Sequence, residues 1–163
     1  MSLDNRPTYS GGCQCGAVRF RVDGALSNVS VCHCRMCQKA FGNFYAPLAT
    51  APAGGLTWTR GQPKRFRSSN HVQRGFCAEC GTPLTFEAPD GVALAIGAFD
   101  HPEELMPTIQ WGIEAKLPYA DDIPSLPGEA TDADAGSATY LRELENYQHP
   151  DYDTDQWPAR GSR

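Results

Sequence analysis

The residues of this chain best suited to chemistry are seven cysteines, which fall into three tight clusters. Each cysteine lies within two or three residues of another, and such short loops close poorly as disulfides because the bond needs a specific Cα spacing and torsion. Thiolates paired in tight loops are instead a usual ligand set for tetrahedral zinc. The clusters, which predict metal binding rather than merely buried thiols, are Cys13 with Cys15, Cys32 with Cys34 and Cys37, and Cys77 with Cys80.

Seven ligands divide into a set of four and a set of three. The C-x-C at 13–15 and the C-x-x-C at 77–80 would together form a closed four-thiolate site, and closed sites are structural. The C-x-C-x-x-C at 32–37 would then supply three ligands and leave an open fourth position, as in zinc sites that do chemistry. The spacing also allows another partition, in which Cys32 and Cys34 complete the four-ligand site.

Several basic side chains lie near the central cluster. The side chain of His33 should point away from its cysteine neighbours in an extended C-x-C, which favours a packing role over that of a fourth ligand. Arg35 and Lys39 would partly offset a negatively charged zinc–thiolate site, or they are exposed positions on a short helix. The other histidines have no metal-like neighbours and are expected in surface or loop positions: His71, His101 and His149.

The elements that must position these residues are short strands. Apolar side chains recur with a period of two and are separated by turn sequences such as Asp23-Gly24, Gly54-Gly55 and the hairpin candidate Pro89-Asp90-Gly91. This pattern predicts a mainly β, antiparallel domain with short helices only over 35–41 and 102–106. The expected strands contain Val18/Phe20/Val22, Val29/Val31, Phe44/Ala46/Leu48, Leu56/Trp58, Val72/Arg74/Phe76, Leu84/Phe86, Val92/Leu94/Ile96 and Ile109/Trp111/Ile113.

The length of 163 residues fits a single domain, and the charge divides it into two parts. Residues 1–126 hold 11 basic and 11 acidic side chains, whereas residues 127–163 hold 3 and 8 and so account for the net charge of −5. We therefore expect a zinc-binding domain over 1–126 and a partly extended acidic C-terminal extension over 127–163. In the extension, 128–138 is typical of a linker, 139–147 could form a short helix, and the end could dock through Tyr152 and Trp157.

The composition excludes several partner classes. An acidic balance disfavours nucleic acid and anionic membranes, since phosphate binding needs clustered cations. The uncharged stretch 41–59 is interrupted by prolines, glycines and polar residues, so it does not predict a membrane span. The first residues lack the pattern of a secretory signal, which predicts a cytoplasmic protein. The local basic segment 60–74 is either the solvated face of a hairpin or a rim that attracts a small carboxylate-bearing substrate.

Three cysteine-containing blocks and one later block resemble the glutathione-dependent formaldehyde-activating enzyme family, whose domain is shared with centromere protein V. The resemblance covers residues 11 to 126 and departs at Leu117-Pro118-Tyr119, where the family often has Leu-Pro-Trp. The matching blocks are Gly11-Gly-Cys-Gln-Cys-Gly-Ala-Val-Arg-Phe20, Cys32-His-Cys-Arg-Met-Cys-Gln-Lys-Ala-Phe-Gly42, Phe76-Cys-Ala-Glu-Cys-Gly-Thr-Pro-Leu84 and Ile96-Gly-Ala-Phe-Asp100.

The resemblance implies a mainly β, Mss4-like antiparallel fold organised around zinc–thiolate sites, with two zinc ions per chain. It implies that the structural zinc is held by Cys13, Cys15, Cys77 and Cys80, and the catalytic one by Cys32, Cys34 and Cys37. The expected activity is that of a zinc-dependent carbon–sulfur lyase similar to S-(hydroxymethyl)glutathione synthase, with a small thiol such as glutathione as partner and the substrate left open.

Two other functions fit the same residues. One is a non-catalytic, zinc-stabilised binding module like the centromere protein V branch. The other is a thiol-based metal or redox sensor that uses an exposed three-cysteine loop. The sequence makes no prediction of the oligomeric state.

Overall fold

The computed structural model of the chain describes residues 6–130, 140 and 143–158. In this part the chain forms one α-helix, α1 (Arg35–Phe41), and short 3-10 helices over Ile96–Ala98, Pro102–Glu104, Ile113–Ala115 and Ile123–Ser125. The strands are β1 (Thr8–Gly12), β2 (Arg19–Asp23), β3 (Ser27–Cys32), β4 (Ala46–Thr50), β5 (Leu56–Arg60), β6 (Lys64–Arg67), β7 (Gln73–Phe76), β8 (Pro83–Ala88), β9 (Gly91–Ala95) and β10 (Ile109–Trp111).

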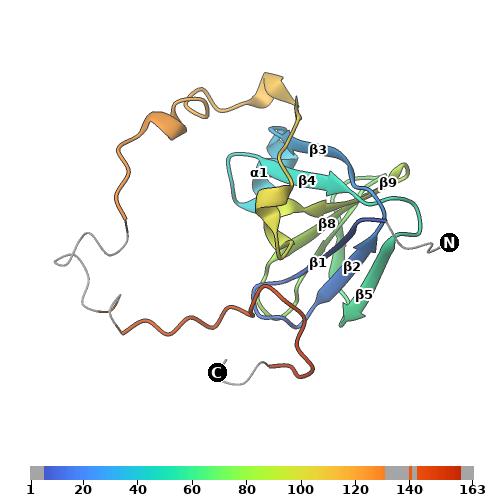
Figure 1. The fold of residues 1–163 in the computed structure, drawn as a ribbon. Helices are drawn as coiled ribbons and strands as arrows, with labels where there is room; N and C mark the ends of the chain where they lie inside the picture. The colour runs from blue at the N-terminus through green and yellow to red at the C-terminus, as the bar shows by residue number, and fades with distance from the viewer. Residues whose placement is uncertain (1–5, 131–139, 141–142, 159–163) are drawn as a thin grey trace.

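The strands of the described residues form two sheets (Figure 1). One has three strands in the order β1-β2-β5, and the other has seven in the order β10-β3-β4-β9-β8-β7-β6. Neighbouring strands are antiparallel except for β10, which runs parallel to β3. The predicted mainly β fold class is confirmed, with this one parallel pair as an addition.

The main hydrophobic core lies between the two sheets. On β2 the alternation predicted from sequence holds from Phe20 to Val22, which are fully buried while Arg21 between them is exposed. Arg19, predicted on the same outward face as Arg21, is instead buried because its guanidinium pairs with Asp100. Leu84 of β8 and Leu94 of β9 are also fully buried and belong to the same cluster as Phe20. Burial of each such side chain stabilises the fold by about 1.5–3 kcal/mol relative to exposure in water.

Most elements predicted from periodicity are present. The helix over 35–41 is α1, and the Pro89-Asp90-Gly91 sequence joins β8 and β9 as an antiparallel hairpin. The helix expected over 102–106 is only a 3-10 turn, Pro102–Glu104. Strands β1 (TYSGG) and β6 (KRFR) were not predicted, because neither carries alternating apolar residues. Their strand geometry follows from antiparallel pairing with β2 and β7.

The C-terminal segment 148–157 lies against the loop that follows β1 (Figure 1). The backbone N–H of His149 donates to the carbonyl of Gln14 at 2.7 Å, and the indole N–H of Trp157 donates to the carbonyl of Cys15 at 2.7 Å. Gly16 has a φ of +78°, and a Cβ there would lie 2.1 Å from the His149 ring. Only glycine therefore fits at position 16 while the segment is docked.

The expectations for this extension are met in part. Trp157 docks as predicted, but Tyr152 is 64% exposed. His149 lies in a loop as expected, yet it is buried rather than on the surface. Residues 143–147 form no helix; the rest of the helix predicted over 139–147, apart from Tyr140, and residues 131–138 of the predicted linker lie outside the described residues.

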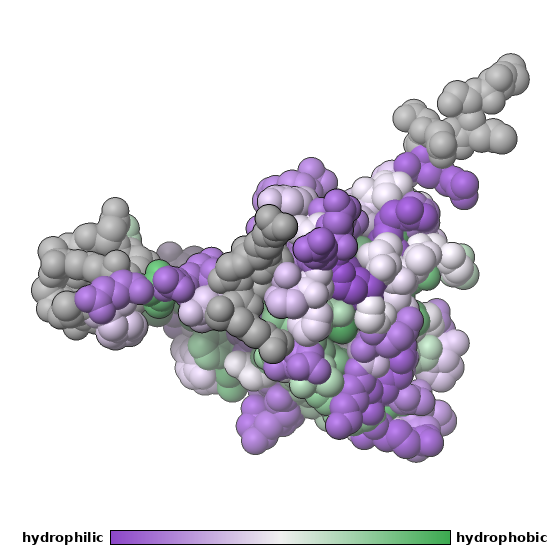
Figure 2. Space-filling view, turned by 90° about the horizontal axis from the view of Figure 1, so that it is seen from below, coloured by the Kyte–Doolittle hydropathy of each residue, from purple (hydrophilic) through white to green (hydrophobic). Residues whose placement is uncertain are grey.

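The face of the molecule seen in Figure 2 is largely polar. Figure 2 shows hydrophilic residues over most of one face, with hydrophobic residues in small separate areas. No helix in the described part of the chain has the length and apolar content that a bilayer crossing needs.

Candidate metal centres

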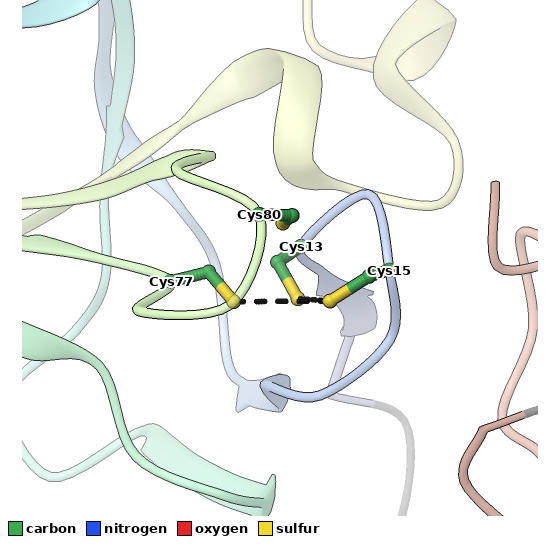
Figure 3. Close-up of side chains that lie close together, drawn as sticks. All are labelled: Cys13, Cys15, Cys77 and Cys80. Atoms are coloured by element: carbon green, nitrogen blue, oxygen red, sulfur yellow. Dashed lines mark hydrogen bonds between the residues drawn. The ribbon is translucent and has the colours of Figure 1, made fainter. Parts of the chain in front are cut away.

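Four cysteines from two loops lie close together (Figure 3). Cys13 and Cys15 come from the loop after β1, and Cys77 and Cys80 come from the loop after β7. The four Sγ atoms all lie within 4.8 Å of one another; Cys13 and Cys15 are 3.6 Å apart, and Cys15 and Cys77 are 3.9 Å apart. Tetrahedral zinc with Zn–S bonds of about 2.3 Å requires sulfur separations of about 3.8 Å. The donor set therefore fits zinc.

Backbone hydrogen bonds give the two loops their shape. In the first loop, the N–H of Gly16 donates to the Cys13 carbonyl at 3.0 Å, and the N–H of Val18 donates to the Cys13 Sγ at 3.3 Å. In the second, the N–H of Gly81 donates to the Cys77 carbonyl at 2.9 Å. These tight turns aim both thiols of each pair toward one point, as a shared metal requires.

The surroundings of the four thiols shift their pKa values in different directions. Burial raises the pKa of Cys13 and Cys15, and it raises that of Cys77 to about 11. At Cys80 burial also opposes ionisation, but the hydroxyl and backbone of Thr82 outweigh it and lower the pKa to about 6. Buried thiols of this kind become thiolates once a cation is bound.

The remaining three cysteines meet around the start of α1. Cys32 ends β3, Cys34 caps the N-terminus of α1, where its Sγ accepts from the N–H of Cys37, and Cys37 lies within the helix. Their Sγ atoms lie within 4.8 Å of one another. No cysteine of the described residues belongs to both groups, and all seven are free thiols. The partition into four and three is therefore the one that the fold brings about.

His33 does not join this cluster. Its Nε2 lies 3.0 Å from Oε1 of Gln110, and its ring packs edge-to-face on Tyr45 with centroids 5.6 Å apart. The geometry agrees with the packing role expected from the alternation of side chains.

Two features hold the three-cysteine loop in place, and sequence reasoning missed both. The buried amide of Gln38 donates to the His33 carbonyl at 2.7 Å and to the Ala115 carbonyl at 3.0 Å, which joins the helix to the segment after β10. Gly112 lies so close to Cys34 that a Cβ there would be 2.8 Å from the Cys34 nitrogen. A larger residue at 112 would therefore displace the loop.

The pKa values of two of the three thiols are shifted in opposite directions. The hydrogen bond with Cys32, followed by the guanidinium of Arg74, lowers the pKa of Cys37 to about 5 against the opposing effect of burial. The same bond and burial raise the pKa of Cys32. Cys37 is therefore the more readily ionised thiol of the pair.

A cavity of about 220 Å³ opens at the three-cysteine cluster. Cys32 and Cys37 form part of its wall, together with the hydroxyl-bearing Ser30 and Thr50 and the ring of Trp111. The cluster thus combines three thiols with a space large enough for a small molecule. The four-cysteine cluster already has a complete tetrahedral donor set.

Comparison with known proteins shows which family the chain resembles. The family model described as glutathione-dependent formaldehyde-activating enzyme matches residues 8–114. The chain belongs to this family. A curated protein of Schizosaccharomyces pombe named as an uncharacterized lyase is 27% identical over 85 residues, which cover 52% of this chain and 61% of that protein. The chain thus spans less than two thirds of that relative's length.

A solved structure supports the fold alone. The crystal structure of a Rhodobacter sphaeroides protein superposes with a TM-score of 0.51 and 22% identity, and the match covers 62% of this chain and 98% of that one. The family assignment made from the cysteine blocks is confirmed, although the family model ends at residue 114 rather than 126. Both cysteine groups of this family member could hold a metal ion.

The basic residues near the cluster meet the expectations only in part. Arg35 and Lys39 are exposed on α1, which fits the simpler interpretation. In the segment 60–74, Arg65 lies on the solvated hairpin face and pairs with Glu87, whereas Arg60 bonds to the Gly16 carbonyl. Arg74 is buried and donates to the Sγ of Cys37 at 3.3 Å. The alternation around Val72 and Phe76 put this residue in a strand but gave no sign of its partner.

Proposed function

We propose that this protein is a zinc-dependent carbon–sulfur lyase that interconverts a small thiol and formaldehyde with their hydroxymethyl adduct. In the forward direction the thiol sulfur forms a bond to the carbonyl carbon, the C=O double bond becomes a single bond, and the thiol proton ends on the oxygen. The family model and the lyase name of the yeast relative both support a reaction of this class.

One observation carries the proposal: the three-cysteine group opens onto a cavity, whereas the four-cysteine group does not need a further ligand. Zinc bound by Cys32, Cys34 and Cys37 would supply a Lewis acid that keeps a bound thiol deprotonated and reactive. The closed site would have a structural role.

Proton transfer, exclusion of water and substrate binding would depend on side chains that line the cavity. The hydroxyls of Ser30 and Thr50 can donate to the oxygen of formaldehyde and pass the proton that ends there. Trp111 and Leu48 supply apolar walls that limit water around the reacting atoms. Asp90 is exposed at the turn that borders the cavity, where its carboxylate could accept a hydrogen bond from the ammonium group of a thiol such as glutathione.

Exchange spectroscopy tests the proposal directly. Mixtures of glutathione and ¹³C-formaldehyde reach equilibrium with the adduct, and the zinc-loaded protein should increase the exchange rate between the two ¹³C signals. Cys34→Ser should abolish the increase, and Ser30→Ala should reduce it by about 100-fold, the lower end of the range for lost proton-transfer assistance. An exchange rate unchanged by zinc-loaded wild-type protein at millimolar glutathione would overturn the proposal in favour of a binding module.

A further inference from the structure

Arg74 is a cation in an unusual place. It lies on β7 of a hairpin whose other basic side chains, Lys64, Arg65 and Arg67 of β6, are exposed, yet only 3% of Arg74 is exposed. Burying a guanidinium costs several kcal/mol unless an opposite charge and hydrogen bonds compensate for the lost water. The contacts of Arg74 should therefore show what compensates it.

The contacts point to the three-cysteine cluster. Nη2 donates to the Sγ of Cys37 at 3.3 Å, Nε donates to the Ser68 hydroxyl at 3.0 Å, and Cζ lies 4.9 Å from the centre of the Phe86 ring. None of the ion pairs formed within the described residues includes Arg74. Cys37 is thus the partner of the guanidinium at this cluster, and both Cys37 and Phe86 line the cavity.

One donor of the guanidinium remains unused. Nη1 is buried and has no hydrogen-bond partner in the described part of the chain. It is bonded to the same carbon as Nη2, so it lies beside the same cluster. Because an unsatisfied buried donor costs about 1–3 kcal/mol, its natural partner is an acceptor that the described residues do not provide.

A cationic hydrogen-bond donor distinguishes this cluster from the other one. Three thiolates and a divalent metal carry a net charge of −1, and a thiolate substrate would raise this to −2 in a largely buried place. The positive charge of the Arg74 guanidinium makes each of these net charges one unit less negative. At the four-cysteine cluster the donors that the described residues offer are neutral, such as the N–H of Val18 and the hydroxyl of Thr82.

We infer that Arg74 is a positioning residue of the three-cysteine site, which fixes the Sγ of Cys37 and supplies the counter-charge for a metal ion and then for an anionic thiol ligand. The thiol part of this inference rests on the proposed function, whereas the metal part does not. Arginine suits this role because its charge is permanent and its planar fork holds two acceptors in fixed directions.

A cobalt titration of the metal-free full-length chain under reducing conditions tests the metal part. Wild-type protein should take up two cobalt ions, each with thiolate-to-cobalt absorption. Arg74→Met should bind the first ion as wild type and the second 10–100-fold more weakly, which is the usual loss when a partner of a ligand is removed. Arg74→Lys, which keeps the charge, should recover part of that affinity. Arg67→Met, in the same hairpin but exposed, should behave as wild type.

Two outcomes would overturn the inference. Undiminished affinity of Arg74→Met for the second cobalt ion would show that the guanidinium does not support the site. Loss of both ions together in Arg74→Met and Arg74→Lys would show a general structural role. The titration uses neither formaldehyde nor a thiol, so its result is independent of the exchange assay. At saturating cobalt, Arg74→Met, which removes the charge, should also weaken the spectral change caused by glutathione, and a response equal to that of wild type would refute the thiol part.

Discussion

Replacing Asp100 by alanine should lower the free energy of unfolding by about 3 kcal/mol, because it leaves a buried arginine without its main partner. Arg19 and Asp100 are 2% and 6% exposed, and two hydrogen bonds of 2.7 and 2.6 Å join their side chains. The pair connects β2 to the segment after β9 and, through Asp153, to the docked C-terminal segment.

The size of the effect depends on the partner that Arg19 keeps in the Asp100→Ala variant. Removing one partner of a buried ion pair costs about 3–5 kcal/mol. Asp153 still lies 2.8 Å from Arg19, but its side chain is 58% exposed, and ion pairs with water access contribute about 0–1 kcal/mol. The expected loss therefore lies near the lower end of the range. With a typical domain stability of about 5–15 kcal/mol, the variant should still fold at 25 °C.

Urea unfolding of the zinc-loaded protein, followed by circular dichroism, measures this loss. Arg21→Gln is the matched control, because its pair with Asp23 is about half exposed and should change stability by less than about 1 kcal/mol. In the double variant Arg19→Met/Asp100→Ala the loss should be smaller than the sum of the losses in the two single variants, since no buried charge is left unpaired. Additivity within about 0.5 kcal/mol would refute the reasoning, because it would mean that the two side chains do not interact.

Two further predictions concern the metal centres and the docked segment. Cys77→Ser should unfold the chain, since structural zinc contributes about 10 kcal/mol to folding. Cys34→Ser should keep the fold and lose one metal ion. An equal loss of the circular dichroism signal in both variants would contradict the division of the cysteines into a structural group of four and an open group of three. Burial, together with Arg19 and Arg60, lowers the pKa of His149, so the folded state takes up its proton less readily than the unfolded state. Docking of residues 148–157 should therefore weaken as pH falls below about 6.5. The NMR resonance of the Trp157 indole N–H should shift as the segment detaches. A chemical shift that stays constant between about pH 5 and 8 would contradict this prediction.

Cysteine spacing predicted much of the candidate site because metal ligands must be close in space and short loops keep them so. The C-x-C and C-x-x-C patterns led to both groups, and the structure brings together the four and the three as the family resemblance implied. Period-two alternation likewise predicted most strands, since a half-buried strand shows its two faces in the sequence. The identity of the metal, the two-ion stoichiometry and the cytoplasmic location stay predictions.

The sequence could not reveal contacts between segments that are distant along the chain. Arg74 lies in a run of basic residues and looks like one more exposed cation, yet the pairing of β7 with β8 buries it against Phe86 and Cys37. The docking of His149 on Gln14 joins positions 135 residues apart, and no local pattern marks it. Both depend on which residues the tertiary fold places opposite one another, and periodicity carries no information about that.

The connectivity of the two cysteine groups gives a physical reason for assigning them different roles. A metal held by the four-cysteine group would join the loop after β1, in the three-stranded sheet, to the loop after β7, in the seven-stranded sheet. Its removal would free a loop of about 60 residues and separate two sheets that share one core. The three-cysteine group lies within residues 32–37, where Gln38 already holds the loop, so a metal there closes almost no chain. Such a site can gain and lose ligands during a reaction without unfolding the protein.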